Sequence, residues 1–253
     1  MGRDGEPAGQ PNRSMRGFWL IAAGSLAATA AAADQPAFGR FLGPVPPVVA
    51  VAAAAGIGWV SLRALARRGW LPGSADRPND TGRHRKRLAN RLGLAAAAAV
   101  PLAGAAIAFD TWGVAFPVDT NVAWPDSLIF YPAIGFVAGV VFRAAPLAAL
   151  VALARWDLGA ETAGELRRDD WRRHPGAAIV AVASLEAVYQ TVGSPSGFEP
   201  ARALFVAPHL FAFGVVELTI LRRCGFETMY TFRLCYYLIW HVGWGAARLE
   251  LLF

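Results

Sequence analysis

RHRKRLANRLGLAAAAAVPLAGAAIAF, residues 83–109, is the stretch of this chain that decides its fold. Residues 92–109 form an apolar run without a charged side chain, and a helix of about 20 mostly apolar residues spans the hydrocarbon core of a bilayer. The preceding residues, 83–91, concentrate positive charge beside that run, as is typical of the cytoplasmic end of a membrane helix. Together they predict a transmembrane helix that starts on the cytoplasmic side.

The composition of the whole chain also indicates a membrane protein. Of its 253 residues, 55% are hydrophobic and 17% are charged, whereas soluble domains carry roughly 25% charged residues. A soluble globule of this size would need more polar side chains to cover its surface. An ordinary soluble enzyme, a disordered chain and a secreted disulfide scaffold are therefore excluded. Cys224 and Cys235 have no zinc-binding spacing and are interpreted as free thiols.

Further apolar runs predict an all-α fold, a polytopic transmembrane helical bundle of about seven spans. Residues 1–16 form a cytoplasmic tail in this interpretation, and residues 17–253 form a single membrane domain. The first span has a basic flank and an alanine-rich end, which a cleaved signal peptide would also show, but we expect an uncleaved helix. The spans are predicted at residues 17–33, 41–62, 92–109, 127–154, 177–193, 203–221 and 228–247.

Positive charge alternates along the tail and the links between the predicted spans. In chain order these segments hold three, one, nine, none, five, one and two Lys or Arg residues. Because basic links stay in the cytoplasm, the pattern predicts a multi-pass protein of the cell membrane with a cytoplasmic N-terminus and an external C-terminus. The net charge of +6 then reflects orientation beside anionic lipid, and we expect the bilayer rather than nucleic acid as partner.

Ionisable side chains inside spans are confined to the last four of them. Such groups are costly in hydrocarbon, so each is a candidate functional residue. Counting along the helices from the span ends places Glu186, His209 and His241 about 10 Å below the outer surface. Two imidazoles and a carboxylate suffice for a catalytic zinc ion with one open position. These three residues are therefore candidate metal ligands, and Zn²⁺ is the candidate cofactor.

A second layer of charge is predicted deeper in the membrane. Glu217 lies near the cytoplasmic end of the sixth span and Arg233 near the start of the seventh, so adjacent antiparallel helices would place them side by side. We interpret them as a structural ion pair. Arg143, near the middle of the fourth span, also needs a partner, and Glu217, Glu186 and Gln190 are the candidates.

Helical spacing indicates that these polar groups face the interior of the bundle. On the fourth span, Gly135 and Gly139 share a face with Arg143 and form a GxxxG pattern that allows a neighbouring helix to approach closely. On the seventh span, polar and aromatic residues recur every three or four positions and so share one face. They are Arg233, Tyr237, His241, Trp244 and Arg248.

The C-terminal half resembles the CPBP (CAAX protease and bacteriocin-processing, or Abi) family of intramembrane metalloproteases. FVAPH at 205–209 fits that family's Phe-x-x-x-His motif, and RRCG at 222–225 followed by His241 matches the layout that leads to its second histidine. FR at 142–143 resembles the end of its Glu-Glu-x-x-x-Arg motif. The resemblance implies a candidate CPBP-type metallo-endopeptidase that cleaves a membrane-embedded or lipidated peptide.

Residues 138–139 are Ala-Gly where the family has two glutamates, and Gly245 stands where it has an asparagine. Glu186 and Gln190 have an E-x-x-x-Q spacing that would substitute for the missing pair. With Arg143 they are the candidate catalytic residues under the resemblance. A single glutamate serves poorly as both metal ligand and general base, so the chain also fits a catalytically degenerate member.

Three functions stay open from the sequence. The first is an intramembrane metal-dependent peptidase. The second is an inactive relative that acts as a binding or assembly partner of another membrane protein. The third is a small transporter that uses the buried Glu/His/Arg seam as a proton or anion path, although transporters often show two related halves and none is visible in this sequence.

Overall fold

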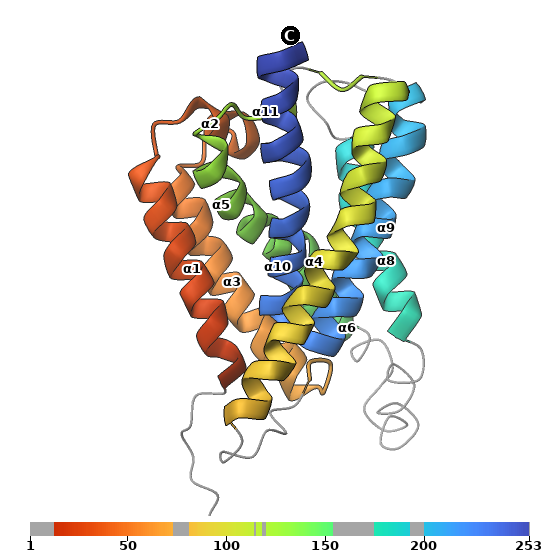
Figure 1. Cartoon of the computed structure of the whole chain (residues 1–253). Helices are drawn as coiled ribbons and strands as arrows, with labels where there is room; N and C mark the ends of the chain where they lie inside the picture. Colours follow the sequence, from red (N-terminus) through yellow and green to blue (C-terminus); the bar gives the residue numbers. More distant parts are fainter. Residues whose placement is uncertain are drawn as a thin grey trace, which may run out of the picture.

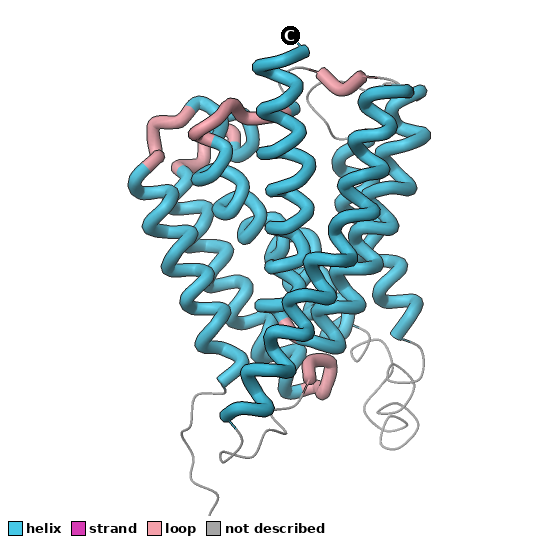
Figure 2. The backbone as a smooth tube through the Cα atoms, in the orientation of Figure 1, coloured by secondary structure: helices cyan, strands magenta, loops and turns pink. Residues whose placement is uncertain are grey.

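The computed structural model of the chain describes residues 13–72, 81–113, 115–117, 120–153, 175–192 and 200–252. These residues form helices joined by turns, without a strand among them (Figure 2). Most of the predicted tail at 1–16 lies outside the described residues. The elements are α1 (Arg13–Ala31), α2 (Pro36–Leu42), α3 (Pro47–Arg67), α4 (Thr81–Trp112), α5 (Ser127–Gly139), η2 (Val140–Ala144), α6 (Ala145–Leu153), α8 (Pro175–Val192), α9 (Pro200–Cys224), α10 (Phe226–Tyr237), η3 (Leu238–Trp244), α11 (Gly245–Ala247) and η4 (Arg248–Leu252).

The long helices pack side by side in one bundle (Figure 1). Helix α1 packs along α3, and α8 packs along α9. Helix α10 contacts α4, α5 and α9, so it lies in the interior of the bundle. The described chain starts at one end of the bundle, and its C-terminus lies at the opposite end (Figure 1). The last helical stretch therefore connects the bundle interior to the end that carries the C-terminus.

Five helical stretches are long and apolar enough to cross a bilayer, and they correspond to the second to sixth predicted spans. The protein is thus a multi-pass helical membrane protein that contacts lipid. The first predicted span corresponds to α1, and the seventh corresponds to the run from α10 to η4. Both segments contain arginines, and neither is among the five. The five stretches are Pro47–Arg67, Lys86–Trp112, Ser127–Leu153, Pro175–Val192 and Pro200–Cys224.

The second span starts later than predicted. The apolar run was expected to be one helix from residue 41, but it is divided into the short helix α2 and the long helix α3, which begins at Pro47. The break lies at Gly43, whose φ of 61° is in the left-handed region that favours glycine. Prolines at positions 44, 46 and 47 follow it, and they cannot supply the N–H groups that would continue α2.

Two of the candidate site residues lie in π-helical segments, which are rare and often occur at functional sites. Arg143 is in η2 and His241 is in η3.

Three prolines lie within or at the start of helices without interrupting them. Helix α4 continues through Pro101 and α5 through Pro132, and Pro146 lies in the first turn of α6.

Candidate functional site

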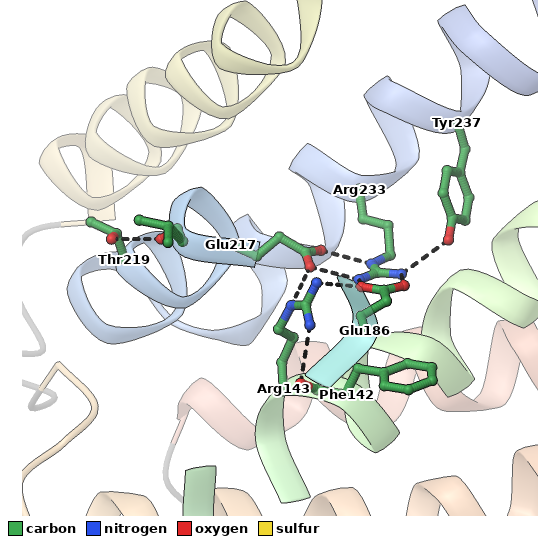
Figure 3. A network of polar contacts seen from close by, with 8 residues as sticks. Phe142, Arg143, Glu186, Glu217, Thr219, Arg233 and Tyr237 are labelled. Atoms are coloured by element: carbon green, nitrogen blue, oxygen red, sulfur yellow. Dashed lines mark hydrogen bonds and ion pairs between the residues drawn. The ribbon is translucent and has the colours of Figure 1, made fainter. Parts of the chain in front are cut away.

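Four charged side chains from four segments of the bundle meet in its interior (Figure 3). They are Arg143 from η2, Glu186 from α8, Glu217 from α9 and Arg233 from α10, and their exposed fractions are 0%, 4%, 0% and 0%. We call them the Arg–Glu cluster. Two guanidinium groups and two carboxylates balance to zero net charge, which is a condition for keeping ions inside a low-dielectric bundle.

Glu217 is bound by both arginines. Arg233 forms a two-pronged contact with it, from Nε to Oε1 at 2.7 Å and from Nη2 to Oε2 at 2.6 Å. The Nε of Arg143 donates to Oε2 of Glu217 at 2.7 Å. Such bidentate, charge-assisted pairs are among the strongest hydrogen bonds in proteins. The predicted neighbours Glu217 and Arg233 are thus in direct contact, and Arg143 joins them.

Glu186 is held by the same two arginines. Arg233 reaches it from Nη1 to Oε1 at 3.3 Å and from Nη2 to Oε2 at 3.1 Å, and Nη2 of Arg143 forms a close ion pair with Oε2. Arg233 also donates from Nη1 to the hydroxyl of Tyr237 at 3.0 Å. Both oxygens of each carboxylate therefore already accept hydrogen bonds from guanidinium groups.

Glycines allow the four segments to come this close. A Cβ placed on Gly214 of α9 would lie 3.1 Å from Ala183 of α8 and 3.1 Å from Nη2 of Arg143. On α5, Gly135 faces the ring of Tyr237, where a Cβ would lie 3.1 Å away, and Gly139 faces Met229. The neighbour that approaches the GxxxG pattern is therefore α10, the helix that carries Arg233.

Glu186 pairs with arginines rather than with the two histidines. The sequence placed it at the same depth as His209 and His241, but its carboxylate contacts Arg233, two helical turns before His241. Gly214 of α9 lies against the main chain of Ala183 of α8, so in these antiparallel helices the backbone of Glu186 is level with α9 about three residues before Gly214. Helix α8 therefore ends about 8 Å short of the level where α9 begins, and the backbone of Glu186 lies within about one helical turn of the level of His209 while its side chain reaches the arginines.

The two histidines both lie near Tyr236. Nε2 of His209 and the Tyr236 hydroxyl are 2.9 Å apart, and the His209 ring stacks on Phe205 with centroids 5.0 Å apart. The His241 ring stacks on Tyr131 at 4.5 Å, and its centroid lies 6.4 Å from that of Tyr236. Each imidazole thus packs against aromatic rings rather than against a carboxylate.

These positions do not fit the predicted zinc site. Among the residues that the structure describes, no group of three or more His, Cys, Asp or Glu side chains is placed to hold a metal ion. Glu186 is occupied by two arginines. Gln190, the remaining candidate catalytic residue, is exposed on α8, whereas the Arg–Glu cluster is buried. The zinc site remains a prediction from the sequence, and no chemical step is derived through it.

A second polar network ties the C-terminal end of the bundle together. Arg248 forms an ion pair from Nε to Oδ2 of Asp110 at 3.0 Å and donates from Nη1 to Oδ1 of Asn121 at 2.8 Å. Trp244 donates from Nε1 to Asp110 at 2.7 Å. The Asn121 amide lies against the main chain and ring of His241. Asp110 and Asn121 were not predicted as site residues, although Arg248 and Trp244 were placed on the polar face.

Asn121 fills the space beside Gly245. A Cβ on Gly245 would lie 2.8 Å from Nδ2 of Asn121. Position 245 is where the CPBP resemblance expects an asparagine, and here an asparagine side chain from a preceding segment takes up that space next to His241. A glycine at 245 is therefore required by the close approach of Asn121.

Comparisons with known proteins find no relative. No family model, no curated protein and no solved structure matches the chain. The likeness to the CPBP family thus rests on short motifs alone, and the function has to be inferred from the geometry of the site.

Proposed function

We propose that the protein is a non-catalytic relative of the CPBP peptidases that acts as a binding or assembly partner of another membrane protein. The observation that carries this proposal is the engagement of both interior carboxylates by both arginines. A metal ligand or a general base needs a lone pair that is open to the metal or the proton. Glu186 could take such a role only by giving up ion pairs in a water-poor interior, which is strongly destabilising.

The proposal includes seven spans in the cell membrane, with the N-terminus cytoplasmic and the C-terminus outside. Support comes from the basic residues at one end of the bundle. Arg67 and Arg68 at the end of α3, and Arg222 and Arg223 at the end of α9, lie at the end where α1 starts (Figure 1). Basic residues of this kind mark the cytoplasmic side.

A polar side chain on the outside of the bundle supports a protein partner. Gln190 is exposed on α8, next to the exposed Tyr189 and Val188. It lies two residues before the end of α8, about 10 Å below the level where α9 begins. A polar residue on a neighbouring transmembrane helix would satisfy an exposed amide at that position. The partner expected here is therefore a membrane helix with a hydrogen-bonding side chain.

Metal content and stability together test the non-catalytic assignment. We expect the purified protein to contain no stoichiometric zinc, and His209→Ala to lower the free energy of unfolding by about 1 kcal/mol through loss of its hydrogen bond to Tyr236. Tyr236→Phe is the matched control, because it removes the same bond from the other side. The two variants should have similar stabilities, and the double variant should be no worse than either.

The competing peptidase hypothesis predicts a different pattern. Stoichiometric zinc in the wild type that is lost in His209→Ala and in His241→Ala, but retained in Tyr236→Phe, would reject the non-catalytic assignment. The measurements are elemental analysis of the purified protein and thermal unfolding in detergent micelles.

A further inference from the structure

Two turns pack against each other at the end of the bundle where α1 starts. Residues 68–72, which follow α3, lie against the turn between α9 and α10. Trp70 is 6% exposed and packs in the same core as Leu221 and Phe226. A Cβ on Gly225 would lie 4.0 Å from Pro72. The contact brings together two basic segments that are more than 150 residues apart in the sequence.

Each of the two turns carries an arginine, Arg68 in the first and Arg222 just before the second. The guanidinium of Arg222 lies over the Trp70 ring, 5.6 Å from its centroid. The Nη1 atom of Arg68, two residues before Trp70, is buried and has no hydrogen-bond partner among the described residues. A buried N–H of a charged group without an acceptor is costly. An acceptor that is not part of the described protein would remove this cost.

The surrounding charge selects an anion. Arg67 and Arg223 are exposed beside Arg68 and Arg222. Glu227, the acidic residue in the first turn of α10, is directed elsewhere, because its side chain packs against Gly17 of α1. The contact between the two turns is therefore basic, with an aromatic ring at its base.

We propose that Arg68, Trp70 and Arg222 form a binding site for the phosphate of an anionic phospholipid headgroup. Guanidinium groups match phosphate oxygens in geometry and charge, and tryptophan is favoured at the level of the headgroups. Basic pockets between the cytoplasmic ends of membrane helices bind anionic lipids in this way. The turns lie at the ends of α3 and α9, where a bilayer would present its headgroups. The site is independent of the function proposed above.

Lipid titration of the purified full-length protein tests this site. The thermal unfolding midpoint is measured in neutral detergent while phosphatidylglycerol, phosphatidylcholine or inorganic phosphate is added. Only phosphatidylglycerol should raise the midpoint. We expect Arg68→Gln and Arg222→Gln each to weaken its apparent affinity about thirtyfold, as for loss of a hydrogen bond between charged groups. Without lipid, Arg68→Gln should unfold at or above the wild-type midpoint, because Nη1 of Arg68 has no partner to lose and the cost of its unsatisfied burial is relieved.

Two neighbouring variants are the matched controls. Arg67→Gln and Arg223→Gln remove the same charge from exposed positions, so each should weaken binding no more than about fivefold, the effect of one charge near an anionic surface. Equal losses in all four variants would overturn the proposal in favour of diffuse attraction. Equal stabilisation by inorganic phosphate would reassign the site to a free anion, and equal stabilisation by phosphatidylcholine would reject recognition of the charge.

Discussion

Replacing Arg233 with methionine should lower the free energy of unfolding by about 3–5 kcal/mol, the usual cost of removing one partner from a buried ion pair. Arg233 contacts both carboxylates of the Arg–Glu cluster. Without it, Arg143 faces Glu186 and Glu217 alone, and the interior carries a net negative charge. The loss is measured by denaturant unfolding in mixed micelles, followed by circular dichroism.

Arg223→Met is the matched control for this variant. Arg223 is an exposed arginine at the end of α9, and exposed substitutions of this kind change stability by no more than about 0.5 kcal/mol. If the Arg233 variant were as stable as the Arg223 variant, the cluster would not hold the bundle together.

Gly214→Leu should cost about 3 kcal/mol, at the upper end of the range for overpacked cores. A side chain at 214 would meet the main chain of Ala183 on α8 and the guanidinium of Arg143. It would separate α8 from α9 and pull Arg143 away from Glu186, so that steric strain and loss of an ion pair add together. The unfolding midpoint in detergent is the measurement.

Gly104→Leu makes the same change at a site with open space. Gly104 is also within a membrane helix, α4, but a Cβ there meets nothing within 4 Å. Leucine is the better helix former by roughly 1 kcal/mol, so this control should be neutral or slightly stabilised. Equal effects at both positions would show that close packing at Gly214 is unimportant.

Much of the fold could be predicted from hydropathy, because a bilayer imposes a fixed length on any helix that crosses it. The contact between Glu217 and Arg233 was also within reach of the sequence. Both residues lie within a few turns of the short connection between α9 and α10, so residue counting from that shared point gives nearly the same depth for each.

The position of Glu186 could not be obtained in the same way. Counting along α8 gives the level of its backbone but not the direction in which its side chain reaches. Interaction with two buried guanidinium groups, rather than distance from a helix end, decides where this carboxylate lies. A sequence pattern gives the spacing of residues along one helix, but it does not give the offset along the bundle axis between two helices.

The network around Arg248 was missed for a related reason. Asn121 comes from an irregular segment without helical periodicity, and its contacts with Arg248 and His241 join positions about 120 residues apart. The sequence does mark Asp110 as a notable position, since it directly follows a charge-free apolar run. Its partner could be identified only once α4 and the C-terminal helix were seen to pack together.

The coupling free energy between Arg233 and Glu217 tests most directly whether the interior charges are a structural cluster. Unfolding free energies are measured for Arg233→Met, Glu217→Leu and the double variant, in which Arg143 and Glu186 remain as a neutral pair. The predicted coupling is about 2–3 kcal/mol, near the upper end for residues in contact, with the double variant more stable than the sum of the single losses implies. Additive losses, with a coupling near zero, would contradict the account.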